Sequence, residues 1–69
     1  MSYKPQVSVR ENGKDVFYPN ALVFATKEEA EASAADVFGR WMLATGYRAV
    51  ESTDPVNYRW IPGKGLEAI

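Results

Sequence analysis

Polar and apolar residues alternate on both sides of Asn12-Gly13, near the start of the chain. Asn-Gly favours a two-residue type I′ turn, because both central residues of that turn need a positive φ. Counting outward from this turn pairs Glu11 with Lys14 and Arg10 with Asp15. Opposite charges then face each other twice, which stabilises a pair of antiparallel strands. The pattern therefore predicts a hairpin in this register.

The register separates the side chains of the hairpin into two faces, because successive strand residues point in opposite directions. One face is apolar and gathers Val7, Val9, Val16 and Tyr18. Phe17 points to the opposite face, beside Ser8, Arg10 and Asp15. The predicted hairpin therefore has one apolar face and one mixed face.

A helical pattern begins after Thr26. The Thr26 hydroxyl can accept a hydrogen bond from the amide of Glu29 while the Glu29 carboxylate returns to the Thr26 amide, the arrangement called a capping box. Apolar and small residues then recur at helical spacing: Ala30, Ala34, Val37, Phe38, Trp41 and Thr45. Gly46 suits the left-handed position that ends a helix. The spacing predicts an amphipathic helix from about residue 27 to residue 45.

Two further strands are predicted at 47–53 and 56–61, joined by a turn at Asp54-Pro55. Residues 62–69 contain two glycines and follow no period, which predicts a flexible C-terminal tail. The predicted fold is α+β. Residues 1–61 form one domain, an antiparallel sheet of about four strands in the order β-β-α-β-β, with one helix packed on one face.

Cysteine and histidine are both absent from the 69 residues. This excludes disulfides and zinc sites of the usual kind, and it also excludes a thiol nucleophile and an imidazole base. The carboxylates and lysines form no recognisable catalytic or metal-binding motif, so we expect no enzyme, no metal and no cofactor. A core this small commonly needs further stabilisation, and a homodimer is therefore considered beside a monomer.

The formal net charge of −1 argues against a protein dedicated to duplex DNA, which would carry a clear positive charge. No apolar run approaches the length of a membrane span, and the N-terminus lacks a signal-peptide pattern. We therefore expect a protein that acts where it is made, with neither duplex DNA nor a membrane as its partner.

Arginine and aromatic residues are concentrated in the predicted strands. Both types are enriched at binding hot spots, and they also clamp phosphates and stack bases. The candidate binding residues are Arg48, Arg59, Asn57, Phe17, Arg10, Tyr47, Tyr58 and Trp60. Three interpretations remain open. The aromatic residues fill the core or a dimer interface while the arginines are solvated, or the set binds a protein, or it binds a nucleotide or nucleic acid.

Three strings, residues 24–32, 47–52 and 54–60, resemble short proteins that bacteriophages and prophages encode. The likeness covers about residues 17–60, and its most specific part is Pro-Val-Asn-Tyr-Arg-Trp. It implies a setting in a bacterial host but assigns no functional residue, because those proteins have no established activity. Small phage proteins of this size commonly block a host complex or sequester a signalling nucleotide, as anti-CRISPR proteins and cyclic-nucleotide sponges do.

We therefore expect a non-enzymatic binding protein that inhibits or modulates a bacterial host factor, such as a defence component, by stoichiometric contact in the host cytoplasm. A host protein complex is the expected partner, and the open face of the sheet is the expected contact surface. The alternative is an oligomeric sponge for a signalling nucleotide, in which arginine pairs with a phosphate and tyrosine or tryptophan stacks on a base.

Overall fold

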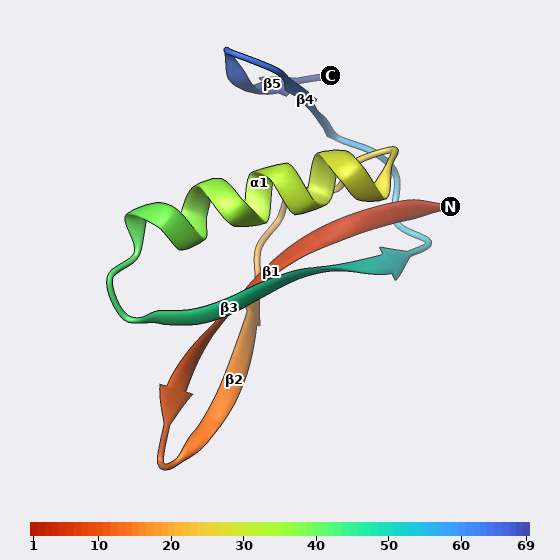
Figure 1. Cartoon of the computed structure of the whole chain (residues 1–69). Helices are drawn as coiled ribbons and strands as arrows, with labels where there is room; N and C mark the ends of the chain where they lie inside the picture. The colour runs from red at the N-terminus through yellow and green to blue at the C-terminus, as the bar shows by residue number, and fades with distance from the viewer.

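The computed structural model describes all residues, 1–69, and contains five strands and one helix. The elements are β1 (Ser2–Glu11), β2 (Lys14–Pro19), α1 (Lys27–Arg40), β3 (Ala44–Ser52), β4 (Tyr58–Ile61) and β5 (Gly65–Ala68). Three strands form an antiparallel sheet in the order β2-β1-β3, and β4 pairs with β5 in a separate hairpin. Figure 1 shows α1 across one face of the sheet and the β4–β5 hairpin on the far side of α1. The α+β class is confirmed, but the strands divide between two sheets.

The predicted β1–β2 hairpin is confirmed in every pair. Glu11 lies opposite Lys14, and the ladder continues in register to Val7 opposite Tyr18. Asn12 and Gly13 have φ values of 50° and 78°, the positive values that a type I′ turn requires. A two-residue loop fixes the register of its strands, so this local signal settled the arrangement of β1 and β2.

Pro5 lies within β1, the central strand of the sheet, where a proline normally removes a ladder hydrogen bond. Tyr3 exchanges two 2.8 Å backbone hydrogen bonds with Phe24, on the β2 side of β1. Backbone groups alternate in direction along a strand, so the Pro5 nitrogen also faces the β2 side. No strand residue pairs with Pro5 on that side, because β2 ends at Pro19 opposite Gln6 and pairing resumes only between Tyr3 and Phe24.

Helix α1 begins where the sequence predicts, with Thr26 as its N-cap. The Glu29 amide donates to the Thr26 hydroxyl oxygen at 3.2 Å. The Glu29 carboxylate does not return to the Thr26 amide. It accepts the Thr26 hydroxyl at 3.0 Å and the backbone N–H of Trp60 at 2.9 Å. Glu29 therefore joins the start of α1 to β4.

The predicted end of the helix is wrong, because α1 stops at Arg40, five residues earlier. Trp41 has an extended backbone, and its side chain is 40% exposed and lies outside the core. Gly46, expected to end the helix, lies in β3 opposite Ser8. A Cβ at Gly46 would come within 3.2 Å of the Ser8 hydroxyl oxygen, so this glycine permits close packing of two strands.

The second predicted hairpin is also wrong. Asp54-Pro55 does not join two paired strands, because β3 pairs with β1 over Ser2–Val9 and β4 pairs with β5. Residues 65–68, predicted to lie in a tail, form β5. Gly63 and Gly65 have φ values of 84° and 97°, which lets the chain reverse between Ile61 and Gly65.

The hydrophobic core lies between α1 and the sheet. Its buried apolar residues are Val7, Val23, Phe24, Ala30 and Ala34. The helix contributes small residues, which allows its backbone to approach the sheet closely. Phe24 is 0% exposed and supplies the largest fully buried side chain. Most of the apolar packing energy therefore depends on few side chains, with Phe24 first among them.

Candidate binding surface

The face of the sheet turned away from α1 carries mostly polar side chains and is called the open face. Tyr47 is the register partner of Val7, and its ring lies 5.3 Å from the ring of Phe38 in α1. The helix therefore covers the face that holds Val7 and Tyr47. The strand alternation assigns the opposite face to Lys4, Gln6, Ser8, Arg10, Asp15, Phe17, Arg48 and Val50.

Arg48 reaches across the open face from one edge of the sheet to the other. Its Nε donates to the side-chain carbonyl of Gln6 on β1 at 2.8 Å. Its guanidinium carbon lies 3.8 Å from the centre of the Phe17 ring on β2. A cation over an aromatic face gains electrostatic stabilisation, and the hydrogen bond fixes the planar group in that position. The three side chains form one unit, called the Arg48 unit, that spans all three strands.

Arg48 is the only arginine without a carboxylate partner. Arg10 pairs with Asp15 at 3.4 Å, Arg40 with Asp36 at 2.7 Å and Arg59 with Glu67 at 2.7 Å. Lys4, also on the open face, pairs with Asp54. Arg48 therefore presents a fixed and uncompensated positive charge to solvent. Its remaining N–H groups suit a carboxylate or phosphate, and its outer face suits a planar group.

A chain of hydroxyl and carboxylate groups borders the Arg48 unit at the hairpin end of the sheet. The Thr45 hydroxyl donates to the Asp15 carboxylate at 3.0 Å, so the Ser8 hydroxyl must donate to the Thr45 oxygen, 2.9 Å away. Ser8 pairs with Gly46 and Val9 pairs with Ala44, so Thr45 is left without a partner on β1 and the register shifts there. These groups satisfy one another's hydrogen bonds, which indicates a structural role.

The structure brings together three of the eight predicted binding residues. Arg10, Phe17 and Arg48 share the open face, as the alternation predicts. Tyr47 lies on the helix-covered face against Phe38. The other four lie outside the three-stranded sheet, in β4 or directly before it: Asn57, Tyr58, Arg59 and Trp60.

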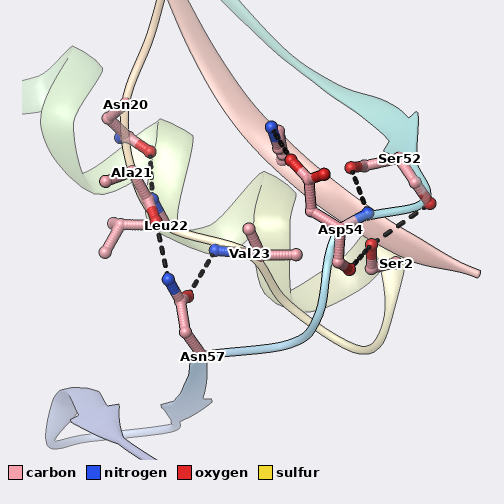
Figure 2. Close-up of polar contacts among 9 residues, drawn as sticks. Ser2, Asn20, Ala21, Leu22, Val23, Ser52, Asp54 and Asn57 are labelled. Atoms are coloured by element: carbon pink, nitrogen blue, oxygen red, sulfur yellow. Dashed lines mark hydrogen bonds and ion pairs between the residues drawn. The ribbon is translucent and has the colours of Figure 1, made fainter.

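Asn57 holds the β4–β5 hairpin to the segment that follows β2. Figure 2 shows its side chain between the backbone groups of Ala21 and Val23. The Asn57 Oδ1 accepts the Val23 amide at 2.8 Å, and its Nδ2 donates to the Ala21 carbonyl at 2.8 Å. The backbone N–H of Asn57 also donates to the Val23 carbonyl at 3.1 Å. Both polar ends of this side chain are therefore occupied within the protein.

A shallow cleft of about 410 Å³ separates α1 from the β4–β5 hairpin. It is lined by Asp36, Trp60, Gly63, Lys64, Gly65 and Leu66. Arg59 alternates with Trp60 along β4 and pairs with Glu67 on β5. The cleft presents one charge of each sign and two apolar side chains, so it offers less chemical selectivity than the Arg48 unit.

The loop between α1 and β3 exposes three consecutive apolar residues, Trp41, Met42 and Leu43. Met42 is 97% exposed and Leu43 is 75% exposed. The sequence assigned this segment to the helix, so it was not recognised as a surface feature. Exposed apolar side chains that lie together are typical of protein contact surfaces.

Tyr18 offers a titration test of the hairpin geometry. Its hydroxyl donates to the Glu11 carboxylate at 2.5 Å. This hydrogen bond, followed by desolvation and the negative charge of Glu11, raises the pKa of Tyr18 above its ordinary value of 10.0. Because the folded-state pKa is the higher one, the bond stabilises the fold below the unfolded pKa. That contribution disappears as the pH rises through the folded-state pKa.

We expect Glu11→Ala to lower the pKa of Tyr18 toward 10.0, measured by the phenolate absorbance in an alkaline titration. Tyr18→Phe identifies the component of the titration that belongs to Tyr18. Identical titration curves for the wild type and Glu11→Ala would contradict the geometry.

Comparison with known proteins does not indicate a function for this chain, so the functional argument depends on its surfaces. No protein-family model, no curated protein and no solved structure matches this chain. No group of three or more His, Cys, Asp or Glu residues is placed to hold a metal ion. Helix α1 lacks the length and the apolar character needed to cross a lipid bilayer.

Proposed function

We propose that this protein is a non-enzymatic binding protein that inhibits or modulates a bacterial host factor by stoichiometric contact through its open face. The observation that supports this most is the Arg48 unit, a fixed guanidinium without a counter-charge on an uncovered sheet surface. Arginine is over-represented among the residues that dominate binding energy. The resemblance to phage-encoded proteins supports the host setting, the bacterial cytoplasm.

A protein is the better-supported class of partner. The exposed apolar loop at Trp41–Leu43 adds an apolar contact surface to the same molecule, and protein interfaces combine apolar contacts with arginine. Arg48 would pair with a carboxylate of the partner, because its free N–H groups form a planar fork that fits a carboxylate. A host complex with an acidic and apolar surface meets both requirements.

Replacement of Arg48 tests this proposal. We expect the immobilised protein to retain a discrete host protein from a bacterial lysate, identified by mass spectrometry. Arg48→Ala should lower the affinity more than tenfold, because truncation of a hot-spot residue costs about 2 kcal/mol or more and about 1.4 kcal/mol corresponds to a tenfold change. Arg59→Ala is the matched control, since Arg59 is also an exposed strand arginine but lies beyond α1 and pairs with Glu67. Equal retention by both variants would contradict the proposal.

A nucleotide sponge is the second candidate, because the Arg48 unit also has the elements of a nucleotide site. A guanidinium can hold a phosphate, and its outer face or an aromatic ring can stack a base. A ligand that binds the folded state raises the apparent melting temperature. A rise with a cyclic or linear nucleotide in the wild type, and none in Arg48→Ala, would favour the sponge over the protein partner.

A further inference from the structure

The outer edge of β3 carries backbone groups that nothing in the subunit satisfies. Tyr3 directs its amide and carbonyl toward Phe24, so alternation directs those of Lys4 and Gln6 toward β3. Lys4 and Gln6 lie opposite Val50 and Arg48, whose backbone groups therefore point inward. The backbone N–H and C=O groups of the intervening residues, Tyr47, Ala49 and Glu51, must therefore point away from β1. None of the hydrogen bonds outside the ladders involves these groups.

The two edges of the sheet differ in protection. Edge strands are usually blunted by charged side chains, especially lysine, by proline, by a bulge or by short length. Strand β2 is six residues long, begins with Lys14 and ends at Pro19, which has no N–H to offer. Strand β3 is nine residues long, and from Gly46 to Ser52 it has neither a lysine nor a proline. Its charged residues there are Arg48, which is directed inward to Gln6 and Phe17, and Glu51. Figure 1 shows no element beside the outer edge of β3.

We infer that β3 pairs with β3 of a second copy of this chain, antiparallel about a two-fold axis at Ala49. In this register the outward-facing residues meet one another: Ala49 meets Ala49 of the second copy, and Tyr47 meets Glu51. Each of these pairs exchanges two backbone hydrogen bonds. The inference concerns the edge of the sheet and does not rest on the proposed function of the open face.

The side chains of β3 are complementary in this register. On the helix-covered face, the hydroxyl of Tyr47, which is 44% exposed in the single subunit, lies opposite the carboxylate of Glu51 in the second copy. On the open face, Arg48 lies opposite Val50 instead of a second Arg48. A shift of the axis to Arg48 would place like charges directly opposite, which is unfavourable. The side chains therefore favour an axis at Ala49 over one at Arg48.

The single subunit gains from such pairing. Only nine of its 69 residues are buried, and chains of this size often use self-association as additional stabilisation. Two copies joined at β3 form one continuous sheet with both helices on one face. Both Arg48 units then lie on the other face, which presents the proposed contact surface twice.

Amide hydrogen exchange tests the pairing without any substitution. In the dimer the amides of Tyr47, Ala49 and Glu51 should exchange as slowly as those of Arg48 and Val50, which are bonded to β1. Light scattering should give the mass of two chains. A monomer in which the three outward amides exchange freely would overturn the inference. If these amides are protected only after a host protein is added, the β3 edge pairs with a strand of that protein. This result would also overturn the inference.

Charge substitutions test the register. Tyr47→Glu should raise the dimer dissociation constant about tenfold or more, because it places a second carboxylate opposite Glu51 on both sides of the axis. Tyr47→Glu combined with Glu51→Lys should restore the dimer. Val16→Glu is the control, because Val16 lies on the same face of the sheet with a similar exposure of 37%, but on the β2 edge. Loss of the dimer in the control, or no rescue by the double variant, would contradict the register.

Discussion

Replacement of Phe24 by alanine should leave the protein largely unfolded at 25 °C. Phe24 is 0% exposed, and truncation of a buried phenylalanine typically costs about 3–5 kcal/mol. A core of this size rarely supplies more than about 3–5 kcal/mol in total. The loss is therefore comparable to the entire stability of the domain.

Urea denaturation followed by circular dichroism measures this effect. Phe24→Leu retains most of the volume and should keep a cooperative transition at lower urea. Leu43→Ala is the control, because Leu43 is 75% exposed and its truncation should change the unfolding free energy by less than about 0.5 kcal/mol. A cooperative transition of Phe24→Ala near that of the wild type would show that the core is not organised around this ring.

Replacement of Asn57 by alanine should destabilise the protein and release the β4–β5 hairpin. The substitution leaves the Val23 amide without its side-chain acceptor, and an unpaired buried donor costs about 1–3 kcal/mol. The Ala21 carbonyl also loses its donor, but Ala21 is exposed and water can replace it.

Asn57→Asp separates the two contacts, because it keeps an acceptor for Val23 and removes the donor to Ala21. Its destabilisation should be smaller than that of Asn57→Ala. Hydrogen exchange at the Trp60 amide, which is bonded to Glu29, reports release of the hairpin directly. If Asn57→Ala and Asn57→Asp leave both the unfolding free energy and the Trp60 exchange rate unchanged, the structural role assigned to Asn57 is wrong.

The parts of the fold that depend on adjacent residues could be predicted from the sequence. Asn12-Gly13 determined the hairpin and its register, because both turn residues and the paired charges lie within a few positions. Thr26 and Glu29 determined the start of α1 for the same reason. Alternation alone placed Phe17 on the face opposite Val7 and Val9, and the structure identifies that face as the open one.

The parts that depend on distant pairing could not be predicted. Helical periodicity continues through Trp41 to Thr45, but pairing of Ala44 with Val9 draws this segment into β3. The Arg48 unit needs Gln6 on a neighbouring strand, and nothing local indicates that contact. Asn57 resembled a free polar residue because its partners lie more than thirty positions earlier in the chain.

The division of the strands between two sheets has a consequence for the candidate residues. Tyr58, Arg59 and Trp60 carry the same residue types as the open face, and composition alone could not separate the two groups. Helix α1 lies between them, so they cannot contribute to one flat contact. The proposed contact surface therefore contains Arg48, Phe17 and Arg10 from the predicted set, with Gln6 added by the structure.

We propose that the open face contacts the partner through Arg48. Nuclear magnetic resonance of the labelled protein, titrated with the host protein that it retains, tests this claim most directly. We predict that the Arg48 side-chain N–H signal and the Phe17 ring signals shift on binding, while the Arg59 side-chain N–H signal stays in place. A shift at Arg59 with none at Arg48 or Phe17 would contradict the account.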